Sequence, residues 1–169
     1  FIGLLSDGGV HSHISHLEEL LRVSSKYNLK NLFIHAITDG RDVDPMSGIN
    51  FIKYANKKFK KYGAIIASVI GRFYAMDRDK RWERIKKSYD LLINGKGIKS
   101  KDLNESILKS YKKGITDEFI EPHYKSNKYG EPIGKIKKDD VIIFFNFRSD
   151  RARELSEVIS QNKINDYNM

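Results

Sequence analysis

Cysteine is absent from the sequence, and its absence excludes several kinds of chemistry at once. No disulfide can form, no thiolate can act as a nucleophile, and no zinc site can use sulfur ligands. Long apolar runs are absent too, because none approaches the roughly 18 residues that a membrane-spanning helix needs. The sequence therefore predicts a globular, cytoplasmic protein without a membrane span, whose chemistry depends on charged and hydroxyl side chains.

Charge of one sign is in excess, since 31 lysines and arginines stand against 22 aspartates and glutamates, a formal net charge of +9. Many lysines occur in pairs, which are typical of solvated helix faces and helix ends. A nucleic-acid footprint is the alternative interpretation of such a basic chain. The arginines differ from the lysines, because they cluster with glycines and acids. The lysine pairs are Lys57-Lys58, Lys60-Lys61, Lys86-Lys87, Lys112-Lys113 and Lys137-Lys138.

The chain has the size of one domain, and 40% of its 169 residues are apolar. Residues 1–5 have the pattern of a buried strand, yet no initiator methionine or signal sequence precedes them. We therefore expect the chain to be a piece of a longer polypeptide. Residues 1–160 form the predicted domain, and residues 161–169 are expected to fray or to begin a linker.

Apolar strand patterns alternate with amphipathic helix patterns along the chain. This alternation predicts an α/β fold, a three-layer αβα sandwich around a mainly parallel sheet. Residues 115–138 carry turn signals and are expected to form an irregular excursion or a small hairpin. The predicted strands are residues 1–5, 31–37, 64–70 and 141–147, and the predicted helices begin at Ser12 or Ser15, Asp44, Asp79, Asp102 or Asn104, and Asp150.

Four loops that follow predicted strands are rich in arginine, aspartate or histidine. Ligands of open α/β sheets bind outside the carboxyl ends of the strands, so these loops are expected to converge. Guanidinium groups bind carboxylate and phosphate oxygens in bidentate pairs. The sequence therefore predicts a site for a small, doubly anionic molecule. The loops are residues 6–13, 39–43, 71–79 and 146–153, with a weaker fifth loop at 116–119.

Each arginine loop has two interpretations. In Asp39-Gly40-Arg41-Asp42, either the charges form an ion pair within the loop, or Arg41 binds an anion while Asp42 exchanges a proton with a hydroxyl group. Similarly, Arg72 and Arg78 either belong to a salt-bridged helix start or clamp one ligand from two sides. Arg148 and Arg151 repeat this pattern before the last helix, whose positive end adds to the field.

Histidine occurs five times, and three positions support an interpretation. His11 follows the first strand and is expected to donate a hydrogen bond to a phosphate or a carboxylate. His35 lies within an apolar strand and is expected to be a core residue, whereas His16 is expected on a helix surface. No histidine pair has the helical spacing of an HExxH motif, so we predict no metal site in this chain.

Five blocks occur in an order and spacing that closely resemble the cofactor-independent phosphoglycerate mutases. One such block would be a weak signal, but five in order over nearly the whole chain are specific. Ser149 departs from the family pattern, because many members have proline there, and both neighbouring arginines remain. The blocks are LLSDGGVHSH (4–13), HAITDGRDV (35–43), GRFYAMDRDKRW (71–82), TDEF (116–119) and FFNFRSDRAR (144–153).

The resemblance implies a substrate-binding domain inserted into an alkaline-phosphatase-like domain of the same polypeptide. That other domain is expected to carry a serine nucleophile, a lysine that reaches the phosphate, and two manganese ions, none of them held by this chain. Asp42 becomes the candidate acid/base at the glycerate hydroxyls. The substrate-binding positions implied by the resemblance are His11, Arg41, Asp42, Arg72, Arg78, Arg148 and Arg151.

The implied reaction is the interconversion of 3-phosphoglycerate and 2-phosphoglycerate in glycolysis and gluconeogenesis, through a phosphoserine intermediate. We expect a monomer that binds no nucleic acid, and we expect this chain alone to be inactive. Two alternatives remain: a stand-alone basic module that binds nucleic acid, and part of another metal-dependent phosphohydrolase. The aromatic residues fall mostly on buried stripes, which counts against the first, and the lack of a metal-ligand cluster counts against the second.

Overall fold

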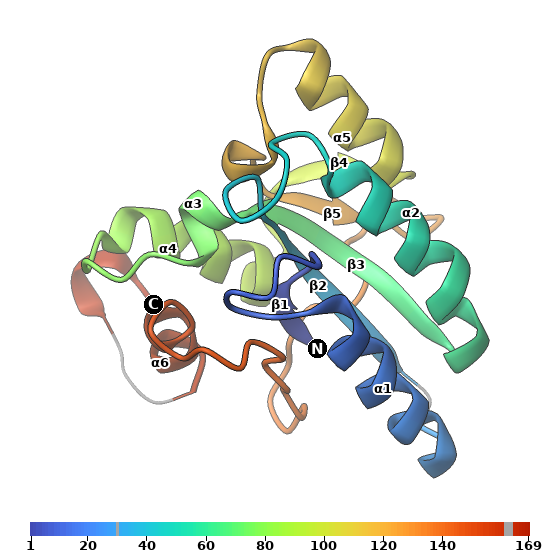
Figure 1. The fold of residues 1–169 in the computed structure, drawn as a ribbon. Coiled ribbons are helices and arrows are strands. Elements are labelled where there is room, and N and C mark those ends of the chain that lie inside the picture. The colour runs from blue at the N-terminus through green and yellow to red at the C-terminus, as the bar shows by residue number, and fades with distance from the viewer. Residues whose placement is uncertain (30, 161–163) are drawn as a thin grey trace.

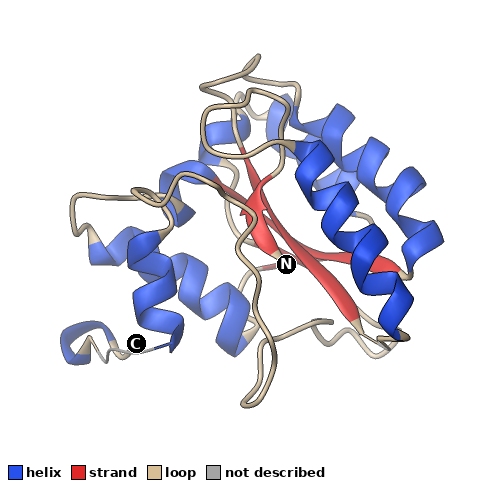
Figure 2. Ribbon diagram, turned by 60° about the horizontal axis from the view of Figure 1, so that its bottom comes forward, coloured by secondary structure: helices blue, strands red, loops and turns tan. Residues whose placement is uncertain are grey.

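The computed structural model describes residues 1–29, 31–160 and 164–169. Within these ranges, a central sheet separates two groups of helices, as Figures 1 and 2 show. One face is covered by α1 (Ile14–Ser24), α2 (Gly48–Lys58) and α5 (Leu103–Lys112). The other carries the short α3 (Arg72–Ala75), α4 (Trp82–Tyr89) and α6 (Arg153–Ser160). The predicted three-layer αβα sandwich is confirmed.

The sheet of the described residues has five strands in the order β1-β2-β3-β5-β4. Three of its four pairings, β1 with β2, β2 with β3 and β4 with β5, are parallel, and only β3 with β5 is antiparallel. The sheet is therefore mainly parallel, as predicted. The strands are β1 (Ile2–Leu4), β2 (Leu32–Thr38), β3 (Ala64–Gly71), β4 (Ile98–Ser100) and β5 (His123–Lys125).

Two hydrophobic cores lie on the two faces of the sheet. In β2, Ile34 and Ala36 face the core under α1, α2 and α5, whereas Ile37 faces the core under α4 and α6. Both faces of β2 are thus buried, which explains its nearly continuous apolar sequence. Because both faces are covered, the polar loops that follow the strands can open only at the ends of the sheet.

Residues 141–147 do not form the fourth strand that the sequence predicts. They touch the sheet through a single bridge between Ile2 and Phe144, flanked by backbone bonds from Ile2 N to Ile143 O and from Phe145 N to Ile2 O. Beyond it, the Leu4 amide donates to the side-chain oxygen of Asn146 at 2.9 Å instead of to a backbone carbonyl. The Asn146 side chain therefore ends the backbone pairing between this segment and β1.

Strands β4 and β5 were not predicted, because each has only three residues and no apolar period. The β5 strand lies within residues 115–138 and pairs with Ser68 and Val69 of β3, more than fifty residues away. A small hairpin follows, closed by the bridge between Ser126 and Pro132, which confirms the hairpin interpretation of this segment.

Helix starts agree with the sequence only in part. Asp102 caps α5 as predicted, accepting a hydrogen bond from the amide of Asn104. In contrast, His13 and not Ser15 caps α1, and α2 begins only at Gly48, after a turn at Asp44. These differences arise because side chains near a helix start compete for the same free amide groups.

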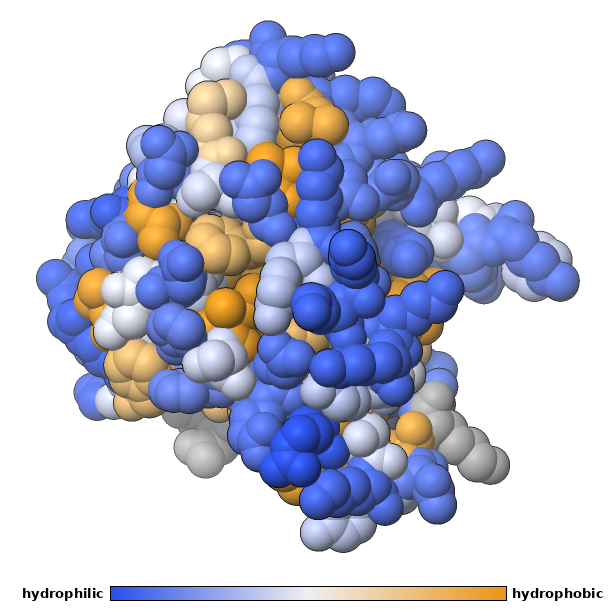
Figure 3. Space-filling view, turned by 45° about the vertical axis from the view of Figure 1, so that its right-hand side comes forward, coloured by the Kyte–Doolittle hydropathy of each residue, from blue (hydrophilic) through white to orange (hydrophobic). Residues whose placement is uncertain are grey.

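The last described residues of the chain lie against the core beneath α4 and α6. Of the predicted frayed tail, residues 161–163 lie outside the described residues, but Asn165–Tyr167 forms a 3₁₀ turn. Met169 is buried in the core beneath α4 and α6, and Ile164 and Tyr167 pack against that core, whereas Asn165, Asp166 and Asn168 are exposed. No helix among the described residues is long and apolar enough to cross a membrane. The face in Figure 3 is mostly hydrophilic, with scattered apolar patches.

Candidate functional site

The loop between β1 and α1 brings His11 beneath the carboxyl end of the sheet. Ser12 donates to the carbonyl of Leu4 and the amide of Ile14 donates to the carbonyl of Ser6, which fold the loop back on its own strand. The carbonyl of His11 accepts from the amides of Phe147 and Arg148 at 2.9 and 3.3 Å. The loop after β1 is thereby joined to the arginine loop near the end of the chain.

Gly8 and Gly9 allow this loop to approach the next one. A Cβ atom on Gly8 would lie 3.1 Å from both the Cβ and the carbonyl oxygen of Asp42. Gly9 has a φ of 70°, which is in the left-handed region that favours glycine. The pair therefore forms a tight turn packed against the Asp39-Gly40-Arg41-Asp42 loop.

Asp39, at the end of β2, organises its loop. Its side chain is almost fully buried, and its Oδ1 accepts from the backbone amides of Arg41 and Asp42 at 3.2 and 3.1 Å. Its Oδ2 accepts from the Ser6 hydroxyl at 2.7 Å. Burial raises the pKa of Asp39, but the bonds from the Asp42 amide, Ser6 and Arg72 outweigh burial and hold the pKa below its ordinary value.

Arg72 lies between two carboxylates. Its Nη1 donates to Oδ1 of Asp39 at 2.5 Å and to Oδ2 of Asp42 at 2.6 Å. The guanidinium is nearly buried, at 4% side-chain exposure, whereas Asp42 is 17% exposed. Within the described residues, no hydrogen bond reaches Oδ1 of Asp42 or the Nε and Nη2 groups of Arg72. One edge of the guanidinium and one oxygen of Asp42 therefore have no hydrogen-bond partner among the described residues.

The fifth, weaker loop supplies the partner of Arg41. Arg41 Nη1 lies 3.5 Å from Oε1 of Glu118, so the loop ion pair between Arg41 and Asp42 does not form. The 3₁₀ turn Asp117–Phe119 is held by Asp117, which is fully buried and accepts from the Gly48 amide at 2.7 Å and from the Tyr111 hydroxyl. Burial raises the pKa of Asp117.

Asp150 joins three of the predicted site residues. Its carboxylate lies 2.9 Å from Nε of Arg148, 3.1 Å from Nη1 of Arg78 and 3.7 Å from Nδ1 of His11. Burial raises the pKa of Asp150. The hydrogen bond from Arg78 and the charge of Arg148 lower the pKa by more than burial raises it, so the net shift is downward. Asp42 and Asp150 thus balance part of the charge of Arg72, Arg78 and Arg148.

Arg151 completes the cluster from the start of the last helical segment. Its Nη1 donates to the carbonyl of Met76 at 2.9 Å, which ties the loop before α6 to the loop after α3. Burial lowers the pKa of Arg151, and the charges of Arg78, Arg72 and Arg41 lower it further. Arg151 therefore lies within the positive field of three other arginines.

His11 lies on the same side of the sheet as these groups. Burial lowers the pKa of His11, and the charges of Arg72 and Arg148 add to that effect. The imidazole is therefore neutral at neutral pH and can donate one hydrogen bond. Asp150 joins His11 after β1 and Arg78 beyond β3 to the loop before α6, and Arg72 joins the end of β3 to the loop after β2.

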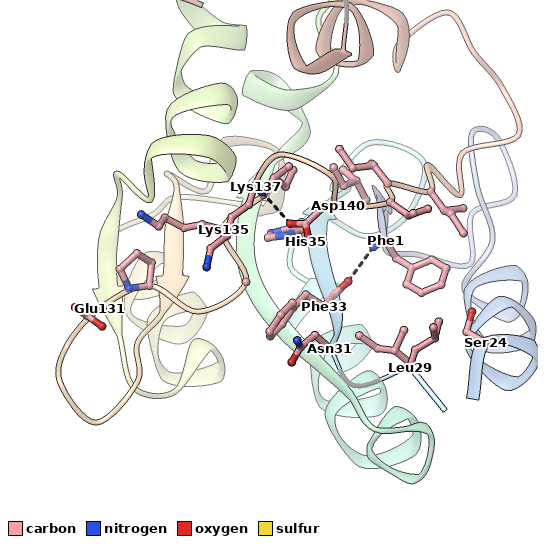
Figure 4. Close-up of a pocket in the computed structure, with 18 residues that line it drawn as sticks. Phe1, Ser24, Leu29, Asn31, Phe33, His35, Glu131, Lys135, Lys137 and Asp140 are labelled. Carbon is pink, nitrogen blue, oxygen red and sulfur yellow. Dashed lines mark hydrogen bonds between the residues drawn. The ribbon is translucent and has the colours of Figure 1, made fainter. Parts of the chain in front are cut away.

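A separate cavity of about 860 Å³ lies at the opposite, amino ends of the strands. Figure 4 shows Phe1, Phe33, His35, Lys135 and Asp140 around it, and no predicted site residue is among the residues that line it. His35 is buried and hydrogen-bonded to Ser68 at 2.8 Å, and burial lowers its pKa to about 3. The prediction that His35 is a core residue is confirmed.

Metal ligands do not gather in the part of the chain that the structure describes. No group of three or more histidine, aspartate or glutamate side chains there could hold an ion. The acids of the arginine cluster are instead paired with cations: Asp39 and Asp42 with Arg72, and Asp150 with Arg78 and Arg148. The residues present therefore fit an anionic ligand and do not fit a metal ion.

Two residues of the cluster were missed by the sequence interpretation. Asp39 had no assigned role, although an aspartate that begins an Asp-Gly turn is a common acceptor for the amides two and three residues later. Glu118 was missed because nothing in the local sequence indicates that it would meet Arg41. Gly40 permits that contact, because a Cβ atom there would lie only 2.8 Å from the amide nitrogen of Glu118 and 3.0 Å from the Cβ of Asp117.

Comparison with known proteins decides between the interpretations. The family model described as "BPG-independent PGAM N-terminus" matches residues 1–169. The chain belongs to this family. Its relatives are 2,3-bisphosphoglycerate-independent phosphoglycerate mutases, so a stand-alone nucleic-acid module and a different phosphohydrolase are not favoured.

Individual relatives agree with the family match. The mutase of Flavobacterium psychrophilum is 59% identical over the whole chain, which covers 34% of that protein. The mutase of Bacteroides thetaiotaomicron is 52% identical over 161 residues, which cover 95% of this chain and 31% of that protein. The solved phosphoglycerate mutase of Leishmania mexicana superposes with a TM-score of 0.92 at 29% identity, over 97% of this chain and 32% of that one. The chain thus spans about a third of these relatives.

Proposed function

We propose that the full-length protein is a phosphoglycerate mutase that interconverts 3-phosphoglycerate and 2-phosphoglycerate, and that this chain is the domain that holds the glycerate. The observation that carries the proposal is the arrangement around Arg72 and Asp42. A buried guanidinium keeps one edge open, beside a carboxylate that keeps one oxygen open. A phosphoglycerate offers a carboxylate to the first and a hydroxyl group to the second.

Asp42 has the geometry of an acid/base. Its Oδ2 is held by Arg72 at 2.6 Å, which prevents rotation of the carboxylate, and its free Oδ1 can take the proton of a glycerate hydroxyl as the oxygen attacks phosphorus. Oδ1 of Asp42 returns the proton when the glycerate oxygen becomes the leaving group. Neutral His11 donates to an oxygen of the ligand, and Arg41, Arg78, Arg148 and Arg151 bind its negative charges.

The phosphoryl group is transferred through a serine of the second domain in this proposal. The glycerate, held by the arginine cluster, turns so that its other hydroxyl meets the phosphoserine. Two manganese ions, bound by the second domain, supply charge stabilisation at the phosphoryl group. We further propose that the protein is a cytoplasmic monomer acting in glycolysis and gluconeogenesis.

An enzyme-coupled assay of the full-length protein tests the proposal. With 3-phosphoglycerate as substrate and enolase as the coupling enzyme, we expect turnover in the presence of manganese without added 2,3-bisphosphoglycerate. The Arg148→Ala variant provides a matched control, because it removes one guanidinium of the cluster without touching the core. Absence of turnover by the wild-type protein, or an unchanged kcat/KM in the variant, would contradict the proposal.

A further inference from the structure

Asp39 is buried behind the proposed glycerate site and lies out of reach of a ligand in the open part of the cluster. Its side chain is 1% exposed, yet it accepts four hydrogen bonds. Two come from the amides of Arg41 and Asp42, one comes from the Ser6 hydroxyl and one comes from Arg72. Every donor except Ser6 belongs to a residue that the sequence assigns to substrate binding.

We propose that Asp39 is a positioning residue for the reaction, which holds Arg72 and Asp42 in their active arrangement. This inference rests on the proposed function. The key atom is Nη1 of Arg72, because both of its hydrogens are used: one by Asp39 at 2.5 Å and one by Asp42 at 2.6 Å. Asp39 therefore decides which edge of the guanidinium faces the ligand and how many oxygens of Asp42 remain free.

The charge of Asp39 is essential to this arrangement. Arg72 is almost buried, and a buried cation needs a nearby counter-ion. With Asp39 neutral, Asp42 would be the remaining acid in contact with the guanidinium. Arginine and carboxylate groups favour the bidentate pair, with two parallel hydrogen bonds. Arg72 would then turn toward Asp42, engage both carboxylate oxygens and occupy the oxygen that the reaction uses.

The Asp39→Asn variant removes the charge and preserves the loop. Its amide oxygen can still accept from the backbone amides of Arg41 and Asp42, and its amide nitrogen can donate to the Ser6 hydroxyl, whose hydrogen is free to rotate. We therefore expect the variant to fold with a melting temperature close to that of the wild-type enzyme. Any loss of turnover then reflects geometry at Arg72 and Asp42.

The test is a double-mutant cycle in kcat on the full-length enzyme. We expect Asp39→Asn to lower kcat by roughly 10- to 100-fold, which is less than the roughly 10²–10⁴-fold contribution of an acid/base, because the variant misplaces Asp42 and does not remove it. In an Asp42→Asn background the same change should cost less than about twofold, because the residue through which Asp39 acts is already lost. Equal factors in both backgrounds would mean that Asp39 supports only the fold, and would overturn the inference.

Asp77 provides the matched control. It is another buried aspartate, 3% exposed, that accepts from two backbone amides and from Arg81, but it does not contact Arg72 or Asp42. Whatever factor Asp77→Asn costs should be the same in the wild-type and Asp42→Asn backgrounds. Non-additivity at Asp39 together with additivity at Asp77 would support the inference.

A crystal structure of full-length Asp39→Asn separates this inference from the proposed function. We expect both terminal nitrogens, or Nε and one terminal nitrogen, of Arg72 on the two oxygens of Asp42. An unmoved guanidinium would overturn the positioning role even if the enzyme is a mutase. A wild-type enzyme without mutase activity would instead contradict the proposed function, and the position of Arg72 in the variant would still decide the role of Asp39.

Discussion

Single arginines in this protein are neutralised by acids from other loops, and this pairing shapes what each residue can do. Arg72 after β3 meets Asp39 and Asp42 after β2, and Arg78 meets Asp150 from the last loop. Because these acids neutralise part of the guanidinium charge, the arginines repel one another less than unpaired guanidinium groups would. A ligand anion must therefore compete with the partly exposed Asp150 for the hydrogen-bond donors of Arg78. The more buried Asp39 and Asp42 instead hold Arg72 in place.

Replacement of Asp42 is expected to impair turnover in the full-length enzyme, whereas replacement of Arg72 is expected to impair substrate binding. Asp42→Asn keeps a side chain of similar size, so substrate affinity should persist while turnover falls by roughly 10²–10⁴-fold, as expected for loss of an acid/base. Arg72→Ala removes an anion-binding fork and should mainly weaken substrate binding. Steady-state kcat and KM distinguish them, and near-normal turnover by Asp42→Asn would exclude the acid/base role.

Asp150 is expected to compete with the ligand anion. It occupies hydrogen-bond donors of Arg78 and Arg148, and all three side chains are partly exposed. Asp150→Asn should therefore raise the affinity of the full-length protein for inorganic phosphate by about fivefold, equivalent to roughly 1 kcal/mol for an exposed pair. Calorimetric titration measures the change. Asp79→Asn is the matched control, because it changes the net charge equally but Asp79 pairs with Arg81, so phosphate affinity should change little. A fall in phosphate affinity in Asp150→Asn would show instead that Asp150 orients the arginines for the ligand.

At the scale of elements, side chains replace backbone pairing wherever the site is assembled. The segment 141–147 reaches β1 through one bridge, and Asn146 then takes the Leu4 amide. Gly71 ends β3 against residues 118–120, where a Cβ would lie 2.3 Å from the carbonyl oxygen of Glu118. These departures from regular pairing place the arginine loops side by side.

Loss of Asn146 is expected to loosen the last arginine loop. Asn146→Ala leaves the Leu4 amide without its acceptor, which should cost about 1–3 kcal/mol of unfolding free energy. Urea unfolding of the 169-residue chain measures this cost. Asn56→Ala, at an exposed position of α2, is the matched control and should change stability by less than about 0.5 kcal/mol. Equal effects of the two variants would contradict this role.

At the scale of the whole molecule, the two ends of the sheet differ. The carboxyl ends of β1, β2 and β3 carry the arginine cluster, whereas His35 lies toward their amino ends and lines the cavity there. Burial lowers the pKa of His35 to about 3 in the folded chain, compared with about 6.5 in an unfolded one. The folded state therefore contains a neutral histidine over a wide range of pH.

His35 is expected to make stability depend on pH. Between pH 6.5 and 3 the unfolded chain binds the proton and the folded chain does not, so stability is full above pH 6.5 and decreases as the pH falls. The slope approaches 1.4 kcal/mol per pH unit, or about 2 kcal/mol between pH 6.5 and 5. Urea unfolding at several pH values checks this. His35→Asn, which can still bond to Ser68, should lose that part of the slope, and an unchanged slope would contradict the prediction.

The isolated 169-residue chain is expected to lack mutase activity. It spans about a third of its relatives, and its described residues hold no metal-ligand group. The enolase-coupled assay with manganese should show no turnover by the chain alone, whereas the full-length protein should be active. Turnover by the isolated chain would require a nucleophile within it and would overturn the two-domain division of labour.

Local sequence predicted those features that depend on neighbouring residues. The apolar runs of β2 and β3 and the stripes of α1, α2 and α5 predict their own burial, because a strand or helix needs only its own residues to define an apolar face. The five family blocks likewise predicted the arginine set. In contrast, β5 has three residues and no periodic signal, so its pairing with Ser68 and Val69 was not predictable.

The sequence by itself determined the chemistry of this protein: guanidinium groups and carboxylates in loops after apolar strands, without cysteine or clustered metal ligands. Tertiary structure decided which charges meet. Nothing in the sequence indicates that Asp42 pairs with Arg72 and not with Arg41, or that Glu118 takes Arg41. The physical reason is that ion pairing depends on distance in space, and the distances between these loops are set by packing around Gly8, Gly40 and Gly71.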